Sequence, residues 1–360
     1  MTSFRVCAFT AVLSWLVVGG AQCKGAACSH AHLGGGGGSQ RTEWAPGARC
    51  PGRRANCRYF KAVCYEGYRD LQAPGGAEPT CDQVAADLAR IAPFTRGIRT
   101  YGSRATEHDG KCIPALTDRL GLDLYMGIWI DSTLSDAANI ASIDESIAVA
   151  QGHPSVKMLL VGNEYMLRAR EAFRDRDASE KNLVRYIRYA RAKAPPGIVV
   201  LTAEADMEWL EASPALFAAV DLVVWQAHPW WAGVAISQAA GAVKTTHERL
   251  LAIMKRYGVA KREVLGETGW PWALQHGEAV GSEANQAQYL RDINRYSAVV
   301  GLEYWVFEAF DESWKNEEGP VGGAWGLWPA NRSMPGHQVI AGLPIPPRVA
   351  SLIPATDMWP

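Results

Sequence analysis

Short apolar runs alternate along the chain with longer segments in which apolar residues recur every three or four positions. The longer segments predict helices, each with one apolar face. Continuous apolar runs suit parallel strands that helices cover from the outside, so eight such runs predict a single TIM (β/α)8 barrel. The predicted strands are Tyr59–Tyr65, Arg96–Tyr101, Leu122–Ile130, Val156–Val161, Gly197–Glu204, Val220–Gln226, Glu263–Glu267 and Leu302–Phe307.

The two ends of the chain depart from this pattern. Arg5 precedes the apolar stretch Val6–Val18, which is shorter than the roughly 20 residues that span a bilayer. Residues 1–21 therefore predict a signal peptide and an exported protein, with a signal anchor as the alternative. Residues 22–57 contain "LGGGGGSQ" and predict a low-complexity, disordered arm. The barrel domain is expected at 58–335, and a Pro-rich tail at 336–360.

The composition narrows the class of protein. Hydrophobic residues make up 48% of the chain, charged residues 20%, and the formal net charge is -1, as in a soluble globular protein. This balance gives no reason to expect a nucleic-acid partner. Tryptophan is the outlier: the chain has 14, and they concentrate from Trp225 onward. Such clustering asks for a functional explanation.

The cysteines all lie in the first third of the chain, at or before Cys112. Loss of Cys7 with the signal peptide leaves an odd number, so at least one thiol is expected to stay free. An oxidising compartment allows disulfides, and the loop-like settings favour Cys81 with Cys112, or Cys50 with Cys57. The spacings fit no zinc site, and no metal is predicted.

Two of the predicted strands are closed by a glutamate. Glu164 follows an aliphatic run in "LLVGNEYMLR", and Glu267 ends another in "EVLGETGWPW". The C-terminal ends of barrel strands form the active face, so both carboxyl groups are expected there. Glycoside hydrolysis needs two such groups, one to protonate the leaving oxygen and one to attack or stabilise the sugar. A salt bridge explains a lone glutamate better, but two after separate strands favour catalysis.

Several motifs together resemble glycoside hydrolase family 17, the β-1,3-glucan-active family of the Asn-Glu barrel clan. They are "VGNE", "GETGWP", "FEAFDESWK" and "WGLW", and the resemblance runs from Phe60 to Trp328. It implies that Glu164 is the acid/base, that Glu267 is the nucleophile, and that Asn163 hydrogen-bonds the sugar 2-hydroxyl. It also implies a retaining mechanism without a cofactor.

The same resemblance extends to residues around the two glutamates. Glu312 and Lys315 match ancillary charged positions of the family's site, and Tyr65 and Tyr101 match aromatics at the ends of strands one and two. The segment "WQAHPWW" differs from the tyrosine-proline or leucine-proline that is commoner at this position in the family. His228 stays a candidate for substrate binding. "EAFDESWK" and "EGPVGGAWGLW" resemble bacterial members more than plant endoglucanases.

The tryptophans offer a surface for sugars, because the C–H faces of a sugar ring pack on indole. Seven of them follow predicted strands six to eight: Trp230, Trp231, Trp270, Trp272, Trp305, Trp314 and Trp325. Trp230, Trp270 and Trp305 are taken as substrate-binding residues. Glu204, Asp206 and Glu208, after strand five, are interpreted as a solvated loop.

The sequence thus predicts a monomeric, retaining hydrolase of β-1,3-glucan, similar to endo-β-1,3-glucanases. A β-1,3-glucanosyltransferase is the first alternative, because it shares the covalent intermediate and differs in whether water or a second sugar resolves it. A non-catalytic glucan-binding protein is the second alternative. Binding alone does not require an acid paired with a nucleophile, so the two glutamates favour an enzyme.

Overall fold

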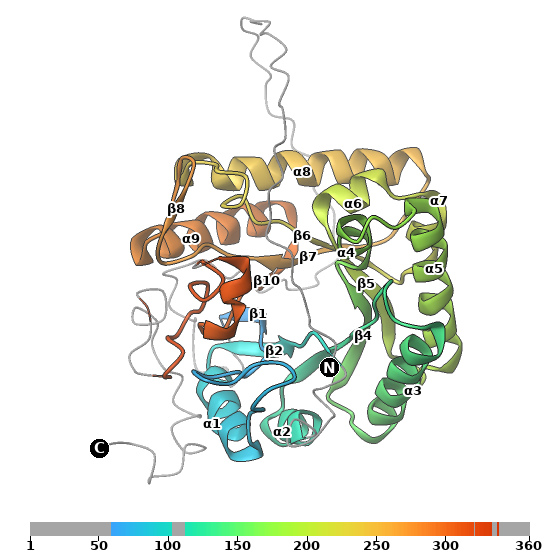
Figure 1. The fold of residues 1–360 in the computed structure, drawn as a ribbon. Helices are drawn as coiled ribbons and strands as arrows, with labels where there is room; N and C mark the ends of the chain where they lie inside the picture. The colour runs from blue at the N-terminus through green and yellow to red at the C-terminus, as the bar shows by residue number, and fades with distance from the viewer. Residues whose placement is uncertain (1–58, 103–111, 320, 333–336, 338–360) are drawn as a thin grey trace, which may run out of the picture.

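Eight parallel strands close into a barrel in the computed structural model of the protein (Figure 1). The structure describes residues 59–102, 112–319, 321–332 and 337. Around the barrel the strand order is β1-β10-β7-β6-β5-β4-β3-β2. Their bounds are β1 Phe60–Cys64, β2 Thr95–Arg99, β3 Asp123–Ile128, β4 Val156–Asn163, β5 Val199–Ala205, β6 Val223–Gln226, β7 Glu263–Thr268 and β10 Glu303–Val306.

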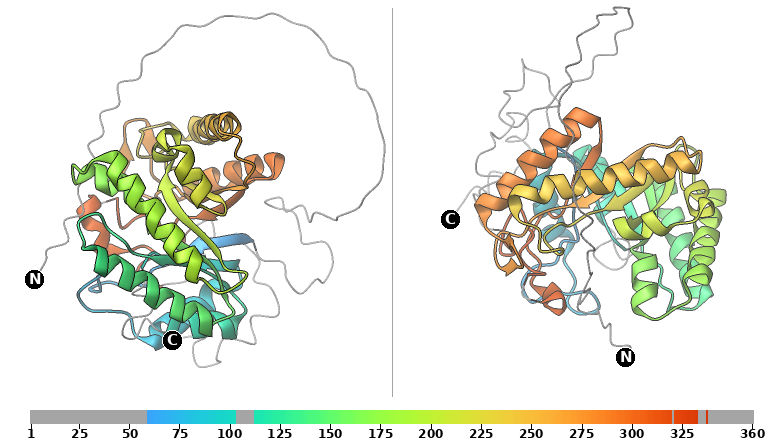
Figure 2. Two further views of the ribbon diagram at one scale, coloured as in Figure 1. Left: turned by 90° about the vertical axis from the view of Figure 1, so that its right-hand side faces the viewer. Right: turned by 90° about the horizontal axis from the view of Figure 1, so that it is seen from above.

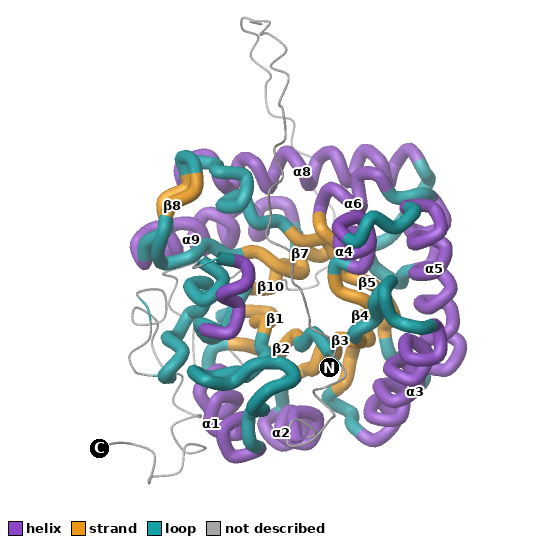
Figure 3. The backbone as a smooth tube through the Cα atoms, in the orientation of Figure 1, coloured by secondary structure: helices purple, strands orange, loops and turns teal. Residues whose placement is uncertain are grey.

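The helices surround this ring of strands as an outer layer (Figure 3). They are α1 Cys81–Ile91, α2 Cys112–Leu120, α3 Asp136–Gly152, α4 Tyr165–Glu171, α5 Arg176–Lys193, α6 Asp206–Glu211, α7 Pro214–Ala219, α8 Ile236–Arg256 and α9 Glu283–Val300. Neighbouring helices such as α3 and α5 run side by side over the strands (Figure 2). A small antiparallel hairpin, β8 Gln275–His276 and β9 Ala279–Val280, follows β7, and a 3₁₀ helix, Ser313–Glu318, follows β10.

The barrel predicted from the alternation is confirmed, because each of the eight predicted runs overlaps one barrel strand. The expected helical faces are also found: Ile143 and Ile147 are buried on α3, and Val243, Leu250 and Met254 on α8. The predicted signal peptide, arm and tail, and the Cys50 and Cys57 pair, lie outside the described residues, apart from His337. None of the described helices is both long and apolar enough to cross a membrane.

Local sequence fixes where several helices begin and end. Thr80 and Gln83 form a capping box at the start of α1, in which each side chain bonds the backbone N–H of the other residue. The Ser135 side chain caps α3, and the Asp175 side chain caps α5. Gly301 ends α9 at φ 76, in the left-handed region that glycine adopts without a steric cost. These caps satisfy backbone groups that have no partner within the helix.

Aromatic side chains fill the barrel interior and brace the loops. The rings of Trp305 on β10 and Tyr125 on β3 stack with their centroids 4.8 Å apart, and neither is more than 1% exposed. Trp270, just after β7, donates its indole N–H to the carbonyl oxygen of Val280 at 2.9 Å. This bond ties the loop after β7 to the β8–β9 hairpin. Trp270 is fully buried as a result.

A disulfide joins Cys81 at the start of α1 to Cys112 at the start of α2, as one of the two expected pairs. Cys64, on β1, has a free and buried thiol. The disulfide therefore crosslinks the first two helices of the outer layer, on either side of β2.

Removal of this crosslink is expected to destabilise the barrel. The two cysteines are 31 residues apart, and a closed loop of this length stabilises a fold by about 3–4 kcal/mol in the chain-entropy model. Cys81→Ser with Cys112→Ser should lower the free energy of unfolding by about that amount. Urea unfolding followed by circular dichroism measures the loss, and the parent protein in reducing agent is the control. Equal unfolding midpoints for the oxidised parent and the variant would contradict this expectation.

Candidate active site

The end of β4 carries Asn163 and then Glu164 in an unusual backbone conformation. Glu164 has φ 48 and ψ 37, in the left-handed region, and Gly162 two residues earlier has φ 87. A left-handed residue other than glycine is strained, and such strain concentrates at functional sites. The turn presents the Glu164 side chain at the C-terminal end of the barrel, immediately before α4.

Glu267 lies at the C-terminal end of β7, where it is 5% exposed. Its cross-strand neighbour is Gln226, the last residue of β6. One carboxylate oxygen, Oε1, accepts hydrogen bonds from the Arg99 guanidinium and, at 2.7 Å, from Gln226 Nε2. Arg99 is the last residue of β2 and is fully buried. A buried guanidinium thus meets a buried carboxylate at the mouth of the barrel.

Asn163 completes this network. Its Oδ1 accepts from Arg99 Nη2 at 2.5 Å and from Gln226 Nε2 at 2.7 Å. A guanidinium has donors only, so the Asn163 atom that faces it must be the oxygen. The Asn163 amide N–H groups are therefore left to donate elsewhere, as a residue that binds a sugar hydroxyl requires.

The two carboxyl groups have opposite electrostatic environments. Burial raises the pKa of Glu164 well above its ordinary value, and the negative charges of Glu267 and Glu204 raise it further. Burial alone would raise the pKa of Glu267 too, but the Arg99 charge and the contact with His228 lower it below its ordinary value. These surroundings favour the protonated form of Glu164 and the ionised form of Glu267. This is the division between a general acid and a nucleophile.

His228 and Tyr101 lie beside this pair. His228 Nε2 is 3.4 Å from Oε2 of Glu267, the oxygen that Arg99 does not hold. The Arg99 guanidinium lies over the Tyr101 ring, 4.4 Å from its centroid. Both residues were expected at the site from the sequence, and both contact the charged network around Glu267.

Glu312 and Lys315 meet in a second charged cluster after β10. Lys315 Nζ lies 2.5 Å from Glu308, 3.1 Å from Glu312 and 4.0 Å from Glu66. Burial raises the pKa of Glu308 well above its ordinary value, with Lys315 opposing the effect and Glu312 adding to it. Lys315 also lies 6.0 Å from the centroid of the Tyr101 ring, which connects this cluster to the Arg99 network.

Other expected site residues are buried among protein side chains. Tyr65 is 1% exposed and donates its hydroxyl to Asp87 at 3.4 Å. Trp270 and Trp305 have no exposed surface and pack as core residues. Trp230 is 3% exposed, in contact with the rings of Trp231, Trp325 and His276. These indole faces are covered by protein, so they offer no platform to a sugar. Among the described residues, the half-buried tryptophans are Trp129, Trp231, Trp272 and Trp314.

The interpretation of residues 204–208 as a solvated loop is wrong. Glu204 is fully buried on β5, and Glu208 is 1% exposed on α6, with Arg170 at 2.7 Å. The sequence analysis also missed Arg99 and Gln226. Their signal was a polar side chain at the C-terminal end of an apolar strand, the same position that identified Glu267.

Comparison with known proteins identifies the family of the chain. A family model, the BtgE/BtgC glycoside hydrolase domain, matches residues 62–326. The chain belongs to this family. The matched range includes every barrel strand except the first two residues of β1, and it includes Glu164 and Glu267.

Two fungal proteins are similar in sequence to this chain. The glucan endo-1,3-beta-glucosidase btgC of Emericella nidulans is 27% identical over 272 residues, which are 67% of this chain and 40% of that protein. A putative glucan endo-1,3-beta-glucosidase btgC of Aspergillus niger is 28% identical over 291 residues, 72% of this chain and 40% of that protein. This glycoside hydrolase chain thus spans about two fifths of the length of these relatives. Both are fungal, so the expectation of a bacterial-type member is not supported.

A solved structure shares the fold. The glycoside hydrolase family 17 β-1,3-glucanosyltransferase from Rhizomucor miehei is similar with a TM-score of 0.64 and 24% identity. The match covers 78% of this chain and 97% of that one. It supports the barrel architecture that the strands show.

Removal of the Arg99 charge is expected to change the ionisation of Glu267. Arg99 holds the pKa of Glu267 down, so in Arg99→Met that pKa should rise by about 1–3 units, the range for loss of a close opposite charge. Carbon NMR titration of protein labelled at its glutamate carboxyl carbons measures the shift, with the Glu267 signal assigned from Glu267→Gln. Arg96→Met, on the exposed face of the same strand, is the control and should leave the titration unchanged. A Glu267 signal that titrates as in the parent protein would refute the role of Arg99.

Proposed function

We propose that this family member is a retaining glycoside hydrolase of β-1,3-glucan, with Glu164 as acid/base and Glu267 as nucleophile. The observation that carries the proposal is the position of two glutamates after β4 and at the end of β7, with Arg99 bonded to Glu267. The opposite directions of their pKa shifts support it. The names of the relatives, glucan endo-1,3-beta-glucosidases, support the substrate. The motifs around both glutamates support family 17.

In the first step the Glu267 carboxylate attacks the anomeric carbon as the glycosidic bond breaks, and the Glu164 proton passes to the departing oxygen. In the second step Glu164 takes a proton from water, the water oxygen attacks the anomeric carbon, and the bond to Glu267 breaks. Two inversions return the β configuration. Asn163 donates to the 2-hydroxyl of the same sugar in this proposal.

Further residues are proposed to bind the substrate around this centre. His228 and Tyr101 contact the Glu267 network, and Glu312 and Lys315 form the charged cluster beside it. Tyr65, Trp230, Trp270 and Trp305 are left out, because each is at most 3% exposed and its ring packs against other side chains. Glu312 is equally buried, so it is proposed to act through its ion pair with Lys315. We also propose export, from the pattern of residues 1–21, and a monomeric enzyme without a cofactor.

A β-1,3-glucanosyltransferase is the alternative, supported by the Rhizomucor miehei structure of that name. Both enzymes form the same glycosyl-enzyme, and they differ in whether water or a sugar hydroxyl attacks it. The choice depends on how the cleft holds an acceptor sugar.

Incubation with laminari-oligosaccharides of one length separates these activities. The hydrolase is expected to give only shorter chains, whereas a transferase also gives longer ones. Chromatography of the products over time measures both. Glu267→Gln keeps the shape of the side chain but lacks the attacking charge, so its turnover should fall by at least about 10³-fold while it still binds the oligosaccharide. No change in chain length with the parent protein would leave a glucan-binding protein and refute the enzyme.

The stereochemistry of azide rescue assigns the two glutamates separately. Glu164→Ala should lose most activity on laminari-oligosaccharides but keep the first step on an activated aryl glycoside, whose leaving group needs no proton. Azide should then speed the second step and give a β-glycosyl azide. In Glu267→Ala azide should enter from the opposite face and give the α product. Proton NMR of the anomeric signal reads each outcome, and an α-configured first product from the parent enzyme would overturn the retaining mechanism.

A further inference from the structure

The turn that carries Glu164 needs support from outside itself. Glu164 is held in the left-handed region and makes no side-chain cap to α4. The first N–H groups of a helix have no partner within the helix, so another group must accept them. A backbone bond from Glu164 N–H to the carbonyl oxygen of Ala203 on β5, 2.8 Å long, holds one side of the turn.

Glu204, the next residue on β5, accepts the N–H groups that follow Glu164. Its Oε1 accepts from Tyr165 N–H at 3.2 Å, and its Oε2 accepts from Met166 N–H at 3.0 Å. The Thr202 hydroxyl donates to Oε1 at 2.9 Å. Glu204 is fully buried, so these bonds are shielded from water. The buried Glu204 side chain thus links the turn after β4 to β5 by hydrogen bonds.

Glu204 also places a charge beside the Glu164 carboxyl group. Burial raises the pKa of Glu204 to about 7, although its hydrogen bonds from Met166 and Thr202 oppose this. Arg168 on α4 favours the ionised form of Glu204, and Glu208 on α6 disfavours it. At neutral pH Glu204 is therefore ionised in part of the molecules.

The charge of Glu204 is one of four that face Glu164. Glu267 from β7 and Glu204 from β5 raise the pKa of Glu164, while Arg168 from α4 and Arg99 from β2 lower it. Burial is the largest contribution, and Glu204 acts in the same direction. The ionised form of Glu204 therefore favours the protonated form of Glu164.

We propose that Glu204 is a positioning residue for the acid/base, which holds the left-handed turn of Glu164 and supplies a negative charge beside its carboxyl group. The inference rests on the proposed role of Glu164. It does not place Glu204 in contact with substrate. Its effect should appear in steps that need the proton of Glu164 and be weak in steps that do not.

Glu204→Gln tests both parts of the proposal. The glutamine has no charge, so the alkaline limb of kcat/KM on laminari-oligosaccharides should move to lower pH by about 0.5–1 unit. Its amide group also replaces one acceptor oxygen, so kcat should fall about tenfold, part of the roughly 10²–10⁴-fold that a general acid contributes. The rate of the first step on an activated aryl glycoside should change less than twofold.

Two conservative variants separate charge from geometry and do not depend on Glu204→Gln folding well. Glu204→Asp keeps the charge but shortens the reach, so kcat should fall with the alkaline limb unmoved. Thr202→Val is close in volume and removes one hydrogen bond that favours ionised Glu204. It should shift the limb in the same direction as Glu204→Gln, but by less.

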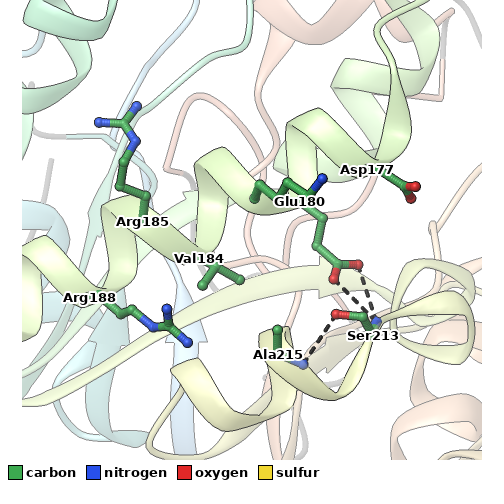
Figure 4. Close-up of a pocket in the computed structure, with 8 residues that line it drawn as sticks. Asp177, Glu180, Val184, Arg185, Arg188, Ser213 and Ala215 are labelled. Carbon is green, nitrogen blue, oxygen red and sulfur yellow. Dashed lines mark hydrogen bonds between the residues drawn. The ribbon is translucent and has the colours of Figure 1, made fainter.

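A matched control is available on the outer layer. Glu180 of α5 is also a buried glutamate that accepts a backbone N–H at the start of a helix, from Ser213 at 3.2 and 3.3 Å, just before α7 (Figure 4). The surface hollow there is lined by α5 and the start of α7 and contains none of the catalytic residues. Glu180→Gln should lower the unfolding midpoint without changing the pH profile.

The outcomes separate this inference from the proposed function. An unmoved alkaline limb in both Glu204→Gln and Thr202→Val, or equal losses on the oligosaccharide and the aryl glycoside, would overturn the role of Glu204. Normal oligosaccharide activity in Glu164→Ala would instead refute the acid/base itself. A limb that moves in Glu180→Gln as it does in Glu204→Gln would show that the shift reflects general destabilisation, and it would also overturn the inference.

Discussion

The ion pair between Arg99 and Glu267 is the contact on which the site depends. A fully buried guanidinium without a partner costs several kcal/mol, so Arg99 requires a carboxylate close to it. Arg99 ends β2 and Glu267 ends β7, so the pair spans the mouth of the barrel and forms only if the ring of strands is closed. Closure of the barrel thus brings the Arg99 guanidinium to the carboxylate of the proposed nucleophile.

This arrangement gives two glutamates different chemistry without different side chains. Glu267 lies against a cation, and its charged form is favoured. Burial and the carboxyl groups of Glu267 and Glu204 favour the neutral form of Glu164. The Asn163 amide connects the two halves, because its oxygen is held by Arg99 while its backbone continues into the Glu164 turn. A change at Arg99 therefore reaches both carboxyl groups.

The sequence predicted what depends on local pattern. The barrel strands are buried on both faces, so they appear as continuous apolar runs, and a glutamate at the end of a run stands out. Arg99 and Gln226 were missed because their importance comes from closure of the barrel, which brings the end of β2 to the ends of β6 and β7. The burial of Glu204 was predicted wrongly. The sequence around a glutamate after an apolar strand does not show whether backbone N–H groups lie within hydrogen-bonding distance of its carboxyl group. Such pairings join residues far apart in the chain.

The tryptophans show the same limit of prediction from sequence, because the sequence does not give the direction in which a side chain points. An indole has an apolar body and one N–H donor, so it serves equally to face a sugar or to brace a loop. Trp270 and Trp305 are buried, and their indole N–H groups donate to the carbonyl oxygen of Val280 and to the carboxylate of Glu303. Trp272 and Trp314 donate to Asp311 and Glu312 but stay half-buried, so their bonds fix the ring while part of it stays exposed.

Exposure, rather than position after a strand, thus decides which tryptophans can meet a sugar. A ring held by its own N–H loses little freedom when a ligand packs on it, which lowers the cost of binding. Trp129, which was not predicted from the sequence, is also half-buried, and the Arg168 guanidinium lies 4.1 Å from its ring centroid. Arg168 in turn bonds the Asn163 carbonyl oxygen and acts on the Glu164 charge. Arg168 thus links the Trp129 ring to the Glu164 turn.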